Sequence, residues 1–258
     1  MQITDVKAFS GPSIYHNRPL LRVRLDIGEL EQHDSSEFPG FVARLLQVIP
    51  GLWDHRCSKG YPGGFVERLR TGTWMAHIVE HMALALSDLA GISVGYGKTV
   101  STDTPGVYDI YVRYENEPGM RELLKVAVEL AEALLADREF DLQPHIEKVR
   151  HLVNNTALGP TTAAIVRAAD MRGIPVRRMN EDSLVQLGQG YKQKRIEAAV
   201  SSQTSHLAVE IAIKIENINL EQRRPAVECR APAETCHAPV SHALDMDRHR
   251  VNAVLETA

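Results

Sequence analysis

The chain has 258 residues, of which 44% are hydrophobic and 24% are charged, and its formal net charge is −4 at pH 7. These values are typical of a globular protein with one large domain, or with one ordinary domain and part of a second. The charge excludes the basic surface that nucleic-acid binding needs, and no apolar run approaches the ~20 residues of a membrane span. Three cysteines and no signal peptide indicate a cytoplasmic protein, with neither nucleic acid nor membrane as partner.

Residues 1–158 predict an α+β fold. Alternation of apolar and polar residues marks strands, and apolar residues at helical spacing mark helices. The expected strands are 2–9, 20–27 and 107–114. The expected helices are 39–49, 73–91, 123–135 and 142–153. This order of elements predicts a mixed sheet with helices packed against it.

A second unit begins after Leu158-Gly159-Pro160. Residues 161–171 have helical spacing, and short strands are expected at 173–176 and 184–187. Residues 206–215 are apolar enough to form either a helix or a strand. From residue 217 to the end the chain has no aromatic residue, so this tail has little to bury and we expect it to be disordered.

The most informative motif is His77-Ile78-Val79-Glu80-His81, an H-x-x-E-H pattern on the helix expected between Thr73 and Gly91. Histidines four residues apart project from one helix face, and neutral imidazoles at this spacing can bind one Zn²⁺. Glu80 shares that face and can act as a general base. Thr73 is the expected N-terminal cap, and Gly91 the expected end of the helix. The alternative is a buried helix whose histidines are satisfied by backbone carbonyls, with a surface glutamate.

A catalytic zinc site needs a third protein ligand. Downstream carboxylates are the natural source, and Glu117 opens the helix that follows the strand ending at Tyr114. Its competitors are Glu115, Glu122, Glu129 and Glu132. Residue types and spacing do not choose among them.

Three other patterns favour ordinary structure over a ligand site. Residues 91–99 resemble a phosphate-binding loop but have Ile92 where that motif needs glycine, so a helix end and a glycine-rich turn are expected. Residues 188–190 precede a basic run and are read as a turn. The Cys and His residues of 229–237 match no usual zinc spacing.

An ordered set of motifs resembles the N-terminal domain of cyanophycin synthetase, over residues 1 to about 213. Synthetases of this family polymerise aspartate and arginine with an ATP-grasp unit and a Mur-ligase-like unit that follow this domain. The matching segments are 55–58, 63–65, 72–74, 77–81, 105–108, 158–161, 172–175, 186–190 and 193–196.

The resemblance implies an N-terminal domain over 1–158, the α/β opening of an ATP-grasp unit over 159–213 and a divergent tail over 214–258. In some members the N-terminal domain is itself a zinc hydrolase, similar in motif to pitrilysin-type peptidases, which cuts the polymer internally to make primers. Carried over, His77 and His81 would bind zinc and Glu80 would be the general base. Glu117 would be the third ligand.

The implied partner is a cyanophycin-like Asp-Arg polypeptide, and homo-oligomerisation is left open. Nearness in sequence makes Arg68, Arg70, Arg113 and Asp54 candidates for binding it. The ATP-binding lysines and Mg²⁺-binding carboxylates of the family are absent, so we expect a truncated synthetase that does not use ATP alone.

Three positions depart from the family's pattern around the motif. Ala76 replaces a glycine, and Ala85 and Ser87 stand where the family has glutamate and glutamine. If the missing glutamate supports the metal or the substrate, hydrolysis would be impaired. The alternative function is therefore a non-catalytic module that binds polymer or supports assembly of the ligase.

Overall fold

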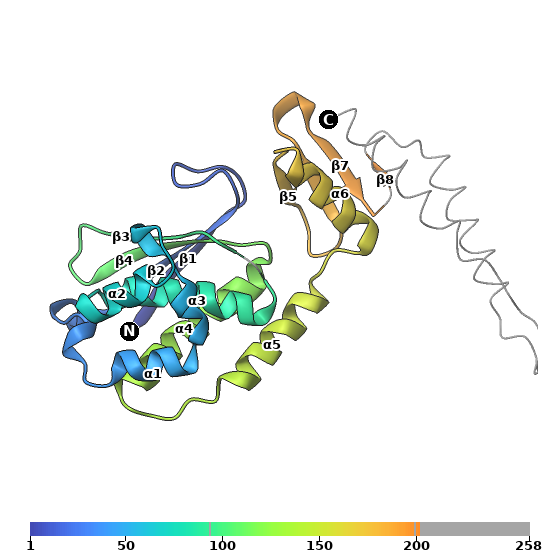
Figure 1. The fold of residues 1–258 in the computed structure, drawn as a ribbon. Helices are drawn as coiled ribbons and strands as arrows, with labels where there is room; N and C mark the ends of the chain where they lie inside the picture. The colour runs from blue at the N-terminus through green and yellow to red at the C-terminus, as the bar shows by residue number, and fades with distance from the viewer. Residues whose placement is uncertain (93, 199, 202–258) are drawn as a thin grey trace, which may run out of the picture. The chain divides into compact units, whose positions relative to one another are not determined.

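The computed structural model describes residues 1–92, 94–198 and 200–201 (Figure 1). The apolar segment 206–215, the tail 214–258 and the Cys and His residues of 229–237 lie outside the described residues. The chain divides into two units, Met1–Ala157 and a second unit that begins at Leu158. Each unit is described by itself.

The first unit is built on a four-stranded sheet in the order β1-β2-β4-β3. Its strands are β1 (Gln2–Phe9), β2 (Leu20–Asp26), β3 (Gly97–Ser101) and β4 (Val107–Arg113). The expected α+β class is confirmed, but every pair in this sheet is antiparallel, so the sheet is not mixed. Short connections join β1 to β2 and β3 to β4, whereas a parallel pair needs a longer crossover.

Among the described residues of the first unit, five α-helices lie together on one side of the sheet (Figure 1). They are α1 (Phe41–Val48), α2 (Gly64–Thr71), α3 (Met75–Ala90), α4 (Glu117–Leu135) and α5 (Leu142–Asn155). The two faces of the sheet differ in the way that period-2 alternation predicts. Val23 pairs with Ile110 and both are buried, while the next pair is Arg24 and Asp109, whose side chains form two hydrogen bonds of 2.9 Å.

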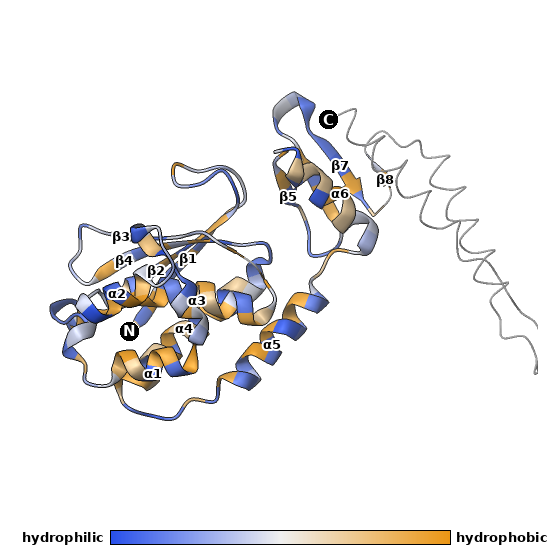
Figure 2. Cartoon of the chain, viewed as in Figure 1, coloured by the Kyte–Doolittle hydropathy of each residue, from blue (hydrophilic) through white to orange (hydrophobic). Residues whose placement is uncertain are grey.

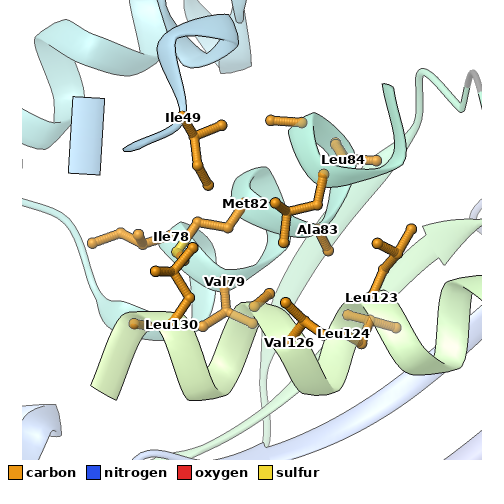
Figure 3. Close-up of a cluster of buried hydrophobic side chains, with 14 of the residues drawn as sticks. Ile49, Ile78, Val79, Met82, Ala83, Leu84, Leu123, Leu124, Val126 and Leu130 are labelled. Carbon is orange, nitrogen blue, oxygen red and sulfur yellow. The ribbon is translucent and has the colours of Figure 1, made fainter. Parts of the chain in front are cut away.

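The packing of α3 against α4 forms the centre of the core. Figure 2 shows hydrophobic residues gathered on these helices, and Figure 3 shows their side chains meeting. The residues labelled there include Ile78, Val79, Met82, Leu123, Val126 and Leu130, all at most 1% exposed. Because the interior is close-packed, truncating one of the larger side chains, such as Met82, to alanine would cost about 2–5 kcal/mol. This packing fixes the helix that carries the H-x-x-E-H motif.

The ends of α3 differ in how well the sequence predicts them. Gly91 is the C-cap, as expected, and adopts a left-handed φ of 81° that favours glycine. The N-cap is Trp74 rather than Thr73, and no side chain caps the helix. Almost the whole helix is buried, but Trp74 at its N-cap and Leu89 near its end are 44% and 42% exposed.

The second unit contains a short antiparallel sheet with one helix packed on it. Its elements are α6 (Pro160–Met171), β5 (Val176–Arg178), β6 (Leu184–Leu187), β7 (Lys194–Glu197) and β8 (Val200–Ser201). The basic run after Gly190 begins in a 3-10 turn, Gly190–Lys192, and continues into β7. Among the described residues, no helix in either unit is long and apolar enough to cross a membrane.

Candidate metal centre

Two histidines of α3 and one cysteine form a cluster of possible metal ligands. One ligand atom from each of Cys57, His77 and His81 lies within 4.8 Å of the others. Cys57 belongs to the 3-10 turn Cys57–Lys59, and its Sγ lies 3.3 Å from Nε2 of His77. Cys57 also has a φ of 51°, a left-handed conformation that is uncommon for a residue other than glycine. Strained residues of this kind often occur at functional sites.

The other contacts of the two imidazoles hold the rings in place. Nδ1 of His77 lies 2.8 Å from the hydroxyl oxygen of Thr73, and Nδ1 of His81 lies 2.8 Å from Nδ1 of His55. The ring of Phe65, from α2, stacks on His81 with a centroid distance of 3.8 Å and an interplanar angle of 17°. The hydroxyl that was expected to cap the helix therefore contacts a candidate ligand.

Burial keeps these imidazoles uncharged at neutral pH. Desolvation, with smaller repulsion from Arg68, lowers the pKa of His77 to about 4. Desolvation and then the neighbouring His77, His55 and Arg68 lower the pKa of His81 to about 2. Since metal ions bind neutral imidazole, the rings are in the form that a metal requires.

Glu80 lies beside this cluster, between α3 and the edge strand β3. Its side chain is only 4% exposed, and its Oε2 accepts a hydrogen bond of 2.6 Å from the hydroxyl of Thr99. Burial raises the pKa of Glu80 to about 7, against the opposing effect of the hydrogen bonds from Thr99. The carboxyl group can therefore take up and release a proton near neutral pH.

The surroundings of Glu80 depend on a glycine. A Cβ built on Gly97 of β3 would lie 2.6 Å from Oε1 of Glu80 and 2.8 Å from its Cγ. Glycine is thus the residue that lets the carboxylate fit against the strand. The alternative interpretation of Glu80 as a surface glutamate is therefore wrong. Its other part, histidines satisfied by backbone carbonyls, is also wrong, because the side chains of Thr73, His55 and Cys57 lie against the ring nitrogens of the two histidines.

The cluster and Glu80 line a cleft with a volume of about 770 Å³. Both signs of charge occur around it. Asp54 and Asp88 act on His55, where their charges oppose the fall in its pKa caused by burial, whereas Arg68 acts on His77 and His81. The charged side chains that line the cleft, besides Glu80, are Asp54, Arg56, Arg68, Asp88 and Lys98.

Of the arginines expected to bind substrate, Arg68 lines the cleft and donates a hydrogen bond of 2.9 Å to the Ser58 hydroxyl. The guanidinium of Arg70 lies over the ring of Trp53, 5.3 Å from its centroid. Arg113, at the end of β4, forms an ion pair of 2.9 Å with Glu115. Neither of these two is among the described residues that line the cleft.

Glu117, the expected third ligand, begins α4 and forms an ion pair of 2.8 Å with Arg121, one turn along the same helix. The group of ligand atoms found among the described residues contains Cys57 and not Glu117. Sequence reasoning missed Cys57 and His55 as site residues. Both lie in the segment 55–58, whose match to the family pattern was the available signal.

A buried His-Glu-His helix at the β3 edge of an antiparallel sheet, with a cysteine beside it, defines an α+β domain whose cleft is lined by a set of candidate metal ligands. Residues 22–136 match the family model of the cyanophycin synthase-like N-terminal domain, so the cleft lies within a domain of this kind.

The chain is related to the N-terminal region of cyanophycin synthetases. Over 217 residues it is 40% identical to cyanophycin synthetase of Synechocystis sp., a match that covers 82% of this chain and 25% of that protein. The synthetases of Nostoc sp. and Geminocystis herdmanii are 39% and 38% identical over the same length, with 24% and 25% of those proteins covered. The chain thus spans about a quarter of the length of these curated relatives.

Proposed function

We propose that the first unit is a zinc-dependent hydrolase that cuts a cyanophycin-like Asp-Arg polypeptide internally and so supplies primers. The observation that carries the proposal is the placement of Cys57, His77 and His81 next to the buried carboxyl group of Glu80 in one cleft. Two neutral imidazoles and a thiol are a donor set that suits Zn²⁺, and they leave room for water and substrate.

His77 and His81 would hold the zinc ion, and we propose Cys57 as the third ligand in place of the predicted Glu117. Bound zinc would polarise the scissile carbonyl group and lower the pKa of water. The thiol of Cys57 would bind as the thiolate, so zinc uptake would release a proton. The left-handed backbone at Cys57 aims this side chain at His77.

Glu80 would be the general base. The Thr99 hydroxyl occupies Oε2, which leaves Oε1 to accept the proton from the attacking water. The missing side chain at Gly97 gives Oε1 the space to do so. Because burial holds the pKa of Glu80 near 7, the same oxygen can then pass the proton to the leaving amine.

The mixed charge of the cleft suits a polymer that carries both guanidinium and carboxylate groups. Asp54 and Asp88 form no ion pair among the described residues, so they are available to guanidinium groups of the substrate. Arg68, on the side of His77, would bind a carboxylate.

One observation favours the second candidate, a module that binds polymer without cutting it. Ala85 lies one turn beyond His81 on α3 and is 3% exposed, so this helix lacks the carboxylate that the family places there. In that case the cleft would bind the Asp-Arg polymer with or without zinc, and no product would form.

The test compares the full chain with Glu80→Gln for zinc content, polymer binding and release of shorter polymer. Hydrolysis by the parent protein alone, with equal zinc in both, supports the hydrolase. Binding without hydrolysis in the zinc-loaded parent protein supports the binding module.

A further inference from the structure

We infer that His55 is a positioning residue, which accepts a hydrogen bond from Nδ1–H of His81 and thereby keeps Nε2 of His81 free for a metal ion. The inference rests on the proposed function and adds a residue that the H-x-x-E-H motif does not contain. The contact that carries it is the 2.8 Å separation between Nδ1 of His55 and Nδ1 of His81.

The two nitrogens are close enough for a hydrogen bond, so one carries a proton and the other accepts it. A neutral imidazole has a single N–H. If Nδ1 of His81 carries this proton, Nε2 of His81 has the lone pair that a metal needs. In the opposite arrangement Nε2 of His81 would be protonated and could not bind a metal. The pairing with His55 therefore selects a tautomer of His81.

The backbone around His55 is held on both sides, which makes it suited to orient another ring. Its N–H donates to the carbonyl of Leu52 over 3.2 Å, and its own carbonyl accepts from the N–H of Phe65 over 3.1 Å. Phe65 in turn stacks on His81, so one aromatic side chain supports both imidazoles.

His77 has a comparable partner in Thr73, whose hydroxyl lies 2.8 Å from its Nδ1. Each candidate histidine ligand thus has a side chain at Nδ1, which is the arrangement by which proteins fix the orientation of metal-binding histidines. Thr73 lies two residues before α3, whereas His55 comes from a separate segment. His55 therefore also ties the loop that carries Cys57 to the helix.

The test uses the full chain and measures zinc affinity by competition with a chelator, for His55→Asn and His55→Leu. Asparagine places an amide oxygen close to the position of Nδ1 and can still accept the hydrogen bond, whereas leucine cannot. We expect the leucine variant to bind zinc about 10–100-fold more weakly and the asparagine variant to stay close to the parent protein. His33→Leu, which replaces an exposed histidine, is the matched control and should leave the zinc affinity unchanged.

A second measurement reads the tautomer of His81 in the metal-free protein from its ¹⁵N chemical shifts. The expected result is a proton on Nδ1 of His81 in the parent protein and in His55→Asn. If the parent protein binds no zinc but shows this tautomer, the role of His55 in setting the tautomer stands and the proposed function fails.

Two results would overturn the inference. One is a parent protein in which His81 carries its proton on Nε2, which decides the matter even if the leucine variant does not fold. The other is a loss of zinc in His55→Asn as complete as in His81→Ala, because His55 would then be a ligand itself.

Discussion

The hydroxyl of Thr99 donates a hydrogen bond of 2.6 Å to the carboxylate of Glu80. This contact joins the edge strand β3 to the helix α3, which carries both candidate histidine ligands. It engages one oxygen of the carboxylate and partly offsets the rise in the pKa of Glu80 that burial causes. The strand therefore helps to set the chemistry of the proposed general base, in addition to lining the cleft.

Gly97→Ala should displace the carboxylate of Glu80, because the new methyl group would lie 2.6 Å from Oε1. We expect kcat for polymer cleavage to fall at least ~10-fold, since a misplaced base loses most of its contribution of about 10²–10⁴. Zinc content should not change. Gly95→Ala is the matched control, because a Cβ there meets nothing within 4 Å. Equal kcat in the two variants would contradict this placement of Glu80.

The stability of the metal-free protein should depend on pH through Glu80. Folding raises its pKa from 4.5 to about 7, so the native state holds more protons than the unfolded state between these values. The stability contributed by the protonated group is complete below pH 4.5 and is lost as the pH rises through 7. Glu80→Gln has no carboxyl group to lose a proton here. Its free energy of unfolding, relative to that of the parent protein, should therefore rise by about 2–3 kcal/mol from pH 5 to pH 8.

Urea unfolding of the two proteins at pH 5 and pH 8 measures this difference. The neighbouring histidines remain in both proteins, so their own titration largely cancels. Glu29→Gln, at an exposed position, should keep a constant difference from the parent protein. If the difference in free energy of unfolding between Glu80→Gln and the parent protein were also the same at pH 5 and pH 8, Glu80 would not be buried in the way described.

The third zinc ligand can be identified by substitution and by cobalt. Cys57→Ser should weaken zinc binding, and Co²⁺ in the parent protein should show a thiolate-to-metal charge-transfer band that the variant lacks. Glu117→Gln should retain full zinc, because its carboxylate pairs with Arg121. Loss of zinc in Glu117→Gln, with no change in Cys57→Ser, would restore the prediction made from the sequence.

Recognition of the polymer should depend on the acidic side of the cleft. Asp88→Asn removes a carboxylate that lines the cleft and forms no ion pair among the described residues, so KM should rise several-fold with little change in kcat. The effect should shrink at high salt, because exposed charges are screened. Asp103→Asn, on the exposed loop before β4, should leave KM unchanged.

Much of the fold was predictable because long, periodic segments carry a strong signal. Apolar spacing predicts the helix around His77 and His81 and the strand before Tyr114. The glycine at position 91 predicts the end of that helix, because glycine readily adopts the left-handed φ found there. Among the described α-helices and strands, those with no counterpart in the prediction are α2, β3, β7 and β8. Half of the residues of α2 are polar and two glycines, Gly63 and Gly64, stand at its start, while β3 is a short strand with one large apolar residue, Val100.

The candidate site, like the fold, could be predicted from the sequence only in part. The motif names His77, Glu80 and His81, and spacing along one helix is enough to place them together. Cys57 and His55 come close to them only through the path of the loop that leads into α2. No periodic pattern encodes that path. A carboxylate such as Glu117 fits a general rule for zinc ligands, and its place at the start of α4 was predicted, but its position relative to the two histidines depends on tertiary packing.

The most direct test of the proposed hydrolase measures zinc content and polymer cleavage on the same samples of the full chain, parent protein beside Glu80→Gln. We predict about one zinc ion per chain in both, and release of shorter Asp-Arg polymer by the parent protein only. Absence of zinc from a folded parent protein, or equal cleavage by both proteins, would contradict the account.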